Sequence, residues 1–108
     1  MNEQFIKLQQ EIEHAEQNHM PIKRLVIQQI QLLKEAHENL LKLAQKRGLD
    51  IEHDTRIIET EVQQFFAMRE LAIKAKLPID EYNELIKQAR IRQFGKESYE
   101  LFLINEKL

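Results

Sequence analysis

The sequence predicts an all-α protein, in which two long helices form an antiparallel hairpin and shorter helices flank it to complete a helical bundle. Helix-forming residues fill most of the 108 positions, whereas Val and Thr are scarce and no alternating strand pattern of convincing length occurs. The two Gly and two Pro residues divide the chain into segments of helix length. A chain of this length is expected to form one domain, residues 1–108.

The first two segments carry clear helix signals. In residues 2–18 the apolar residues recur at spacings of three and four and form one narrow stripe, made of Phe5, Leu8, Ile12 and Ala15. Pro21 suits the first turn of the next helix, because the N–H that proline lacks would have no partner there. We expect this second helix to cover residues 21–47, since a cationic last turn precedes Gly48.

Three further helices are expected in the second half of the chain. Asp50 is the expected N-cap of a third helix over residues 51–76, which should end there because a proline follows two residues later. Asp80 is the expected cap of a fourth helix that reaches Phe94. Residues 98–108 predict a short last helix whose apolar residues point in all directions, a pattern typical of an interface or of a segment packed between other elements.

The second and third helices are too long and too apolar for a compact domain of this size. Each would be roughly 40 Å long, whereas the radius of gyration of such a domain is roughly 13 Å. Apolar residues cover about half of the circumference of the second helix and still more of the third. We therefore expect both helices to contact neighbours on two sides. Either the molecule is elongated, or a second copy covers what protrudes, and we expect a homodimer or a subunit of a helical complex.

Two polar residues interrupt the apolar face of each long helix: Gln29 and His37 on the second, Glu61 and Arg69 on the third. In an antiparallel hairpin centred on Leu49, the numbers of facing residues add up to 98, which pairs His37 with Glu61 and Gln29 with Arg69. Because a buried polar group needs a partner, we expect both pairs to be in contact. Side chains that reach a solvated edge are the alternative interpretation.

Several chemistries find no support in the sequence. Without cysteine there can be no disulfide, thiolate nucleophile or cysteine-based zinc site. One Glu-x-x-His motif, from Glu11 to His14, is present, whereas carboxylate-bridged di-iron bundles use two. Gly48 and Gly95 stand alone, so no glycine-rich phosphate loop is formed. We expect no metal, no cofactor and no enzymatic activity. No apolar run approaches the roughly 20 residues of a membrane span, so a soluble, cytoplasmic protein is expected.

Nucleic-acid binding is the alternative function that the sequence leaves open. The net charge of −2 is balanced, but basic residues gather in the fourth helix and just after it with no acidic residue between Glu84 and Glu97. The second helix also has a basic outer side. The candidate phosphate contacts are Lys87, Arg90, Arg92 and Lys96.

The preferred interpretation is a non-enzymatic protein–protein interaction module, such as an adaptor, an assembly chaperone, an immunity protein or an accessory protein. It would act by burying apolar helix faces against a partner or a second copy. The expected anchors are Phe65, Phe66, Tyr99 and Phe102, since large aromatic side chains dominate interface energetics. For Phe65 and Phe66, a position in the protein's own core is the competing interpretation.

Overall fold

The computed structural model describes residues 3–107, without the side chains of Phe102 and of residues 105–107, and this range is all-α with no strand. It contains five helices. They are α1 (Glu3–Gln17), α2 (Lys23–Lys46), α3 (Thr55–Lys74), α4 (Asp80–Phe94) and α5 (Lys96–Lys107).

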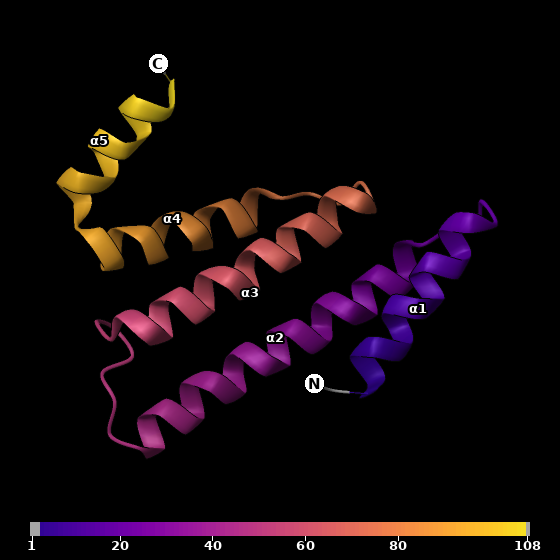
Figure 1. Cartoon of the computed structure of the whole chain (residues 1–108), viewed down its shortest axis with the longest axis horizontal. Coiled ribbons are helices and arrows are strands. Elements are labelled where there is room, and N and C mark those ends of the chain that lie inside the picture. Colours follow the sequence, from indigo (N-terminus) through magenta and orange to yellow (C-terminus); the bar gives the residue numbers. More distant parts are fainter. Residues whose placement is uncertain (1–2, 108) are drawn as a thin grey trace.

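Each helix packs against the next one in the sequence (Figure 1). The hairpin of α2 and α3 is antiparallel, α1 folds back along the first half of α2, and α4 runs back along α3. The prediction that both long helices have neighbours on two sides is confirmed, since α2 lies between α1 and α3, and α3 lies between α2 and α4. The last helix, α5, packs on the end of α4 and projects away from the other helices.

The core is formed by the facing sides of the first four helices, with α3 at its centre. The sequence predicted the side that α1 buries, as Leu8, Ile12 and Ala15 are its buried residues. The residues of the main core cluster are Ile12, Val26, Ile30, Ile58, Val62, Phe65, Met68, Ala72, Tyr82, Ile86 and Ala89.

The molecule is a flat layer of helices. Its Cα atoms span 46 × 42 × 17 Å, and the radius of gyration is 16.0 Å, compared with about 13 Å for a compact domain of 108 residues. The two long helices account for this shape, because α2 has 24 residues and α3 has 20, which corresponds to about 36 Å and 30 Å. In the part of the chain that the structure describes, no helix is both long and apolar enough to cross a bilayer.

The third helix begins later than the sequence predicted. Asp54, not Asp50, is its N-cap, because the Asp54 carboxylate accepts hydrogen bonds from the backbone N–H groups of Arg56 and Ile57 at 3.0 and 3.3 Å. A side-chain hydrogen bond from Arg56 holds the pKa of the Asp54 carboxyl below its ordinary value. Asp50 instead closes a separate turn by accepting the N–H of Glu52 at 3.0 Å. Residues 51–54 are therefore a turn and a cap, and α3 starts at Thr55.

The start of α4 also differs from the prediction in its cap. The capping residue is Ile79, which offers no side-chain hydrogen bond, and Asp80 is the first helical residue. The carboxylates of Asp80 and Glu81 lie in the first turn, where they interact favourably with the positive end of the helix dipole. The end of α4 is as expected: Gly95 has φ 85° and ψ 155°, a conformation open to glycine alone, and it forms the elbow before α5.

Three helices end in the same hydrogen-bonded motif, and only one of them uses glycine there. At the ends of α1, α2 and α3 the left-handed residues are His19, Gly48 and Lys76, with φ values of 56°, 73° and 58°. In each case the next N–H reaches back five residues, as from Leu77 to the carbonyl of Ala72 at 2.8 Å. His19 and Lys76 are therefore side-chain-bearing residues at positive φ, a conformation that is strained for them but that Gly48 adopts without strain.

This geometry predicts that Lys76→Gly stabilises the protein. Glycine removes the cost of holding a side-chain-bearing residue at positive φ, and the gain should be about 0.5–1 kcal/mol after the loss of backbone entropy. Urea unfolding followed by circular dichroism measures the free energy of unfolding. Lys76→Ala is the matched control, because it shortens the side chain but keeps the Cβ atom. An equal gain from both variants would contradict the explanation.

Candidate functional site

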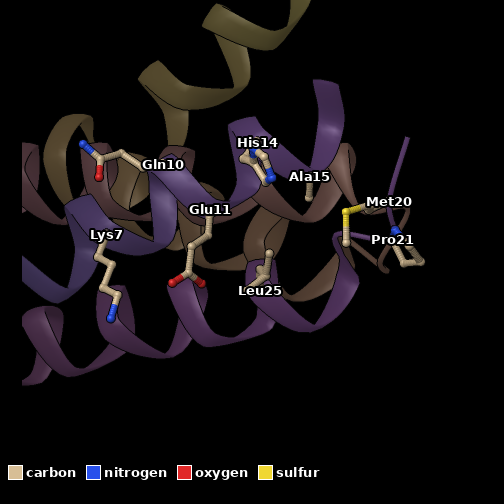
Figure 2. A pocket seen from close by; sticks show the side chains of 8 residues that line it. All are labelled: Lys7, Gln10, Glu11, His14, Ala15, Met20, Pro21 and Leu25. Carbon is tan, nitrogen blue, oxygen red and sulfur yellow. The ribbon is translucent and has the colours of Figure 1, made fainter. Parts of the chain in front are cut away.

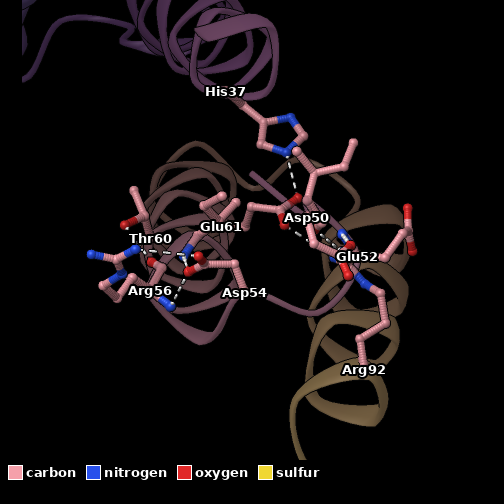
Figure 3. Close-up of polar contacts among 10 residues, drawn as sticks. His37, Asp50, Glu52, Asp54, Arg56, Thr60, Glu61 and Arg92 are labelled. Atoms are coloured by element: carbon pink, nitrogen blue, oxygen red, sulfur yellow. Dashed lines mark hydrogen bonds and ion pairs between the residues drawn. The ribbon is translucent and has the colours of Figure 1, made fainter. Parts of the chain in front are cut away.

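A buried carboxylate joins three helices near the turn between α2 and α3 (Figure 3). Glu61 of α3 is 3% exposed, and its Oε2 lies 2.8 Å from Nε2 of His37 on α2. From α4, Nη2 of Arg92 donates to Oε1 of Glu61 at 3.3 Å, and its Nη1 donates to the carbonyl of Ile51 at 3.3 Å. We call Glu61, His37 and Arg92 the Glu61 clamp. Both carboxylate oxygens are thereby satisfied, as a buried charge requires.

The contact between His37 and Glu61 is the one that the hairpin register predicted. The ring of His37 also packs on Phe65, with the ring centroids 5.0 Å apart and the planes tilted by 60°. An apolar ring on one side and a carboxylate at its Nε2 atom hold the imidazole in a single orientation. The polar interruption in α2 therefore serves to align α2 with α3.

The second predicted pair, Gln29 with Arg69, is not formed. Arg69 instead donates to Oδ1 of Asn83 on α4 at 3.0 Å, and Oε1 of the buried Gln29 has no hydrogen-bond partner among the described residues. The reason is rotation about the helix axis. Eight residues separate Glu61 from Arg69, and eight residues turn a helix about 80° beyond two full turns. Arg69 therefore faces α4, whereas Glu61 reaches His37 on α2.

Arg90 and Arg92, two of the four candidate phosphate contacts, point towards α3. Arg90 donates to Oε1 of Gln93 at 2.7 Å and to Oε2 of Glu59 at 3.4 Å. Glu59 also accepts a hydrogen bond from Gln93, and this bond is the main cause that holds the pKa of its carboxyl below the ordinary value. Since Arg92 belongs to the Glu61 clamp, only Lys87 and Lys96 of the four lie exposed.

The contacts between α3 and α4 follow a register that the sequence could have revealed. In the second hairpin the facing residues Glu61 and Arg92 have numbers that add up to 153, and Arg69 and Asn83 add up to 152. The same rule that paired His37 with Glu61, centred now on Lys76, pairs Arg69 with Asn83 and comes within one residue of pairing Glu61 with Arg92. The basic residues of α4 do not indicate this register by themselves, because a cluster of cations is equally typical of a solvent-exposed surface.

The aromatic residues predicted to anchor an interface lie in different environments. Phe65 is 3% exposed and belongs to the core, so its assignment to a partner interface is wrong. Phe66 is half-buried beneath the guanidinium of Arg69, 4.8 Å from its ring centroid, and Tyr99 is also half-buried. The side chain of Phe102 lies outside the described residues. These are helix positions at which sequence periodicity alone cannot separate core from interface.

The large apolar side chains that the structure exposes are not the predicted interface aromatics. The large exposed apolar residues are Ile6, Met20, Ile27, Leu43, Leu49, Ile73, Phe94, Leu101 and Ile104. Three of them follow each other closely along the chain, at the elbow between α4 and α5 and on α5 itself. We call the two on α5, Leu101 and Ile104, the outer α5 face.

A groove between α1 and the start of α2 holds the single Glu-x-x-His motif (Figure 2). It has a volume of about 490 Å³, and Glu11 and His14 line it together with apolar residues such as Met20 and Leu25. Among the side chains that the structure describes, no group of three or more His, Asp or Glu residues is placed to hold a metal ion.

Comparison with known proteins adds no assignment. No protein-family model, curated protein or solved structure matches the chain. The features of the described residues from which a function can be inferred are the Glu61 clamp, the outer α5 face and the cavities.

The Glu61 clamp predicts a large stability effect for Glu61→Gln. The amide removes the charge from both contacts at nearly constant shape, so the free energy of unfolding should fall by about 1.5–3 kcal/mol. Urea unfolding at neutral pH measures this change. Glu59→Gln is the control, because the Glu59 side chain is 47% exposed and its contact with Arg90 is worth less. Equal losses from the two variants would contradict the clamp.

Proposed function

We propose that the protein is a helical protein–protein interaction module, rather than an enzyme, and that it pairs with a second copy of itself through the outer α5 face. The observation that carries this proposal is the surface area. The chain exposes 7922 Å², whereas a compact monomer of 13.0 kDa exposes about 6,300 Å². The excess of about 1,600 Å² is larger than the roughly 800 Å² that each partner buries in a standard protein interface.

The position of the outer α5 face supports its role as the contact. Leu101 and Ile104 are 63% and 55% exposed. At 100° per residue, Leu101 and Ile104 lie on the side of α5 opposite to Tyr99 and Leu103, which are half-buried. The last helix thus has two apolar sides, and its own chain covers one of them. Each large side chain that a partner buries would contribute about 1.5–3 kcal/mol.

This proposal moves the interface away from the long hairpin. The wide apolar faces of α2 and α3, which predicted a partner from the sequence, are covered by α1 and α4 of the same chain. Single apolar residues such as Ile27 and Ile73 stay exposed on these helices, whereas α5 projects from the layer (Figure 1) and exposes both Leu101 and Ile104. A second copy is a suitable occupant because the net charge of −2 sets only a small repulsion against self-association.

Light scattering coupled to size exclusion tests the proposal. The purified chain is expected at twice its mass of 13.0 kDa, and the double variant Leu101→Asp, Ile104→Asp is expected at the mass of one chain. Both residues are exposed, so the variant should keep its helical circular dichroism. Ile27→Asp, an equally exposed apolar residue on α2, is the control and should leave the dimer intact.

Two results would overturn this assignment. A wild-type chain that stays at the mass of one chain at micromolar concentrations would exclude self-association. A dimer that the α5 variant leaves intact, or that Ile27→Asp disrupts equally, would place the interface elsewhere. A stable complex with a different protein and no dimer would keep the interaction module but replace the second copy.

Nucleic-acid binding remains the alternative, and the contacts of α4 count against it. Arg90 and Arg92 are engaged with acidic side chains of α3, which leaves Lys87 and Lys96 without the cluster that the sequence suggested. We expect no band shift with short DNA or RNA duplexes at low salt, where phosphate contacts are strongest. A shift that weakens with rising salt and with Lys87→Gln would favour the alternative.

A further inference from the structure

The cavity that residues of α3, α4 and α5 line points to a ligand site, and we propose that it binds a small organic anion with a flat apolar body. The cavity has a volume of about 340 Å³, within the range of about 300–1,000 Å³ that is common for ligand sites. The proposal does not depend on dimerisation, because this cavity uses the inner side of α5 and the proposed dimer uses the outer side.

The apolar part of the cavity comes from three helices. Phe66 of α3, Ile86 of α4, and Tyr99 and Leu103 of α5 line it. Two of these four side chains are aromatic rings, which favour a flat partner that can stack on them. An apolar lining with a few polar groups is the usual composition of a small-molecule site.

The polar part of the cavity is cationic. Arg69, Lys87 and Arg90 line it with Asn83, and no carboxylate occurs among its described lining residues. The charge of Arg90 is balanced by Glu59 at 3.4 Å. The charges of Arg69 and Lys87 are not balanced, because Arg69 bonds to the neutral Asn83, and Lys87 has no ion pair or hydrogen bond with any described residue.

Arg69 is also held in place before any ligand arrives. Its guanidinium donates to Asn83 at 3.0 Å and lies 4.8 Å from the centroid of Phe66. A cation that is already positioned loses little conformational entropy on binding an anion. Because this fixed charge adjoins an aromatic ring, one ligand can satisfy both features only if it carries an anionic group on an apolar body.

A single small molecule suits the site better than a polyanion. Nucleic acids are held by a row of free cations along a surface, whereas here two unbalanced charges adjoin one cavity. Carboxylates and phosphate esters share the required chemistry, so the probes must separate the contribution of the charge from that of the rings.

Titration of the full-length chain with 2-naphthoate, followed by amide chemical shifts, tests the site. We expect saturable shifts in α4 and α5. The uncharged 2-naphthamide lacks the anion, and inorganic phosphate lacks the rings. Both probes should bind at least about tenfold more weakly than 2-naphthoate. The reason is that one charge-assisted contact, or one stacked ring, changes the dissociation constant about tenfold.

Two variants locate the binding. Lys87→Gln removes an exposed cation without a partner and should not affect folding, and Arg69→Gln removes the positioned guanidinium. Each should weaken 2-naphthoate binding about tenfold, and Lys42→Gln, an exposed lysine of α2 with the same change of charge, should leave it unchanged. The proposal is overturned if 2-naphthoate shows no saturable binding, if the neutral amide binds as tightly, or if Lys87→Gln and Arg69→Gln leave the affinity unchanged.

Discussion

The arrangement of the central helices depends on one buried carboxylate. Glu61 is almost fully removed from water, and a buried charge is tolerated only with partners at hydrogen-bond distance. His37 supplies one partner from α2, and Arg92 supplies the other from α4. A slip of either helix by one turn, about 5.4 Å, would remove its partner from reach. The same side chain therefore sets the axial position of both hairpins, while apolar packing supplies most of the favourable free energy.

The alignment of α3 with α4 also decides which basic side chains remain free. The clamp occupies Arg92, and Glu59 occupies Arg90, so these two guanidinium groups join α4 to α3. The same register brings Arg69 beside Asn83 and leaves Lys87 unpaired at the edge of a cavity. The basic residues that form one cluster in the sequence are thus of two kinds in the structure. Some are paired with carboxylates of α3, and others line the proposed ligand cavity.

The flat shape has a consequence for α5. A layer of helices only 17 Å thick offers no cleft deep enough to bury both sides of a terminal helix. The inner side, with Tyr99 and Leu103, closes the proposed anion cavity, and the outer side, with Leu101 and Ile104, stays exposed. The two proposed activities therefore use opposite sides of the same helix, and an anion that orders α5 would also order the proposed dimer contact.

The sequence alone determined the helical class, the four breaks between helices that each hold one Gly or Pro, the antiparallel hairpin, and the contact of His37 with Glu61. These follow from local backbone preferences and from axial position, which residue numbers encode directly. Only the tertiary structure decided that Arg69 turns towards Asn83, that Phe65 belongs to the core, and which side of α5 stays exposed. The physical reason is that these outcomes depend on how far each helix is rotated about its axis, and that rotation is set by the packing of all neighbouring helices together.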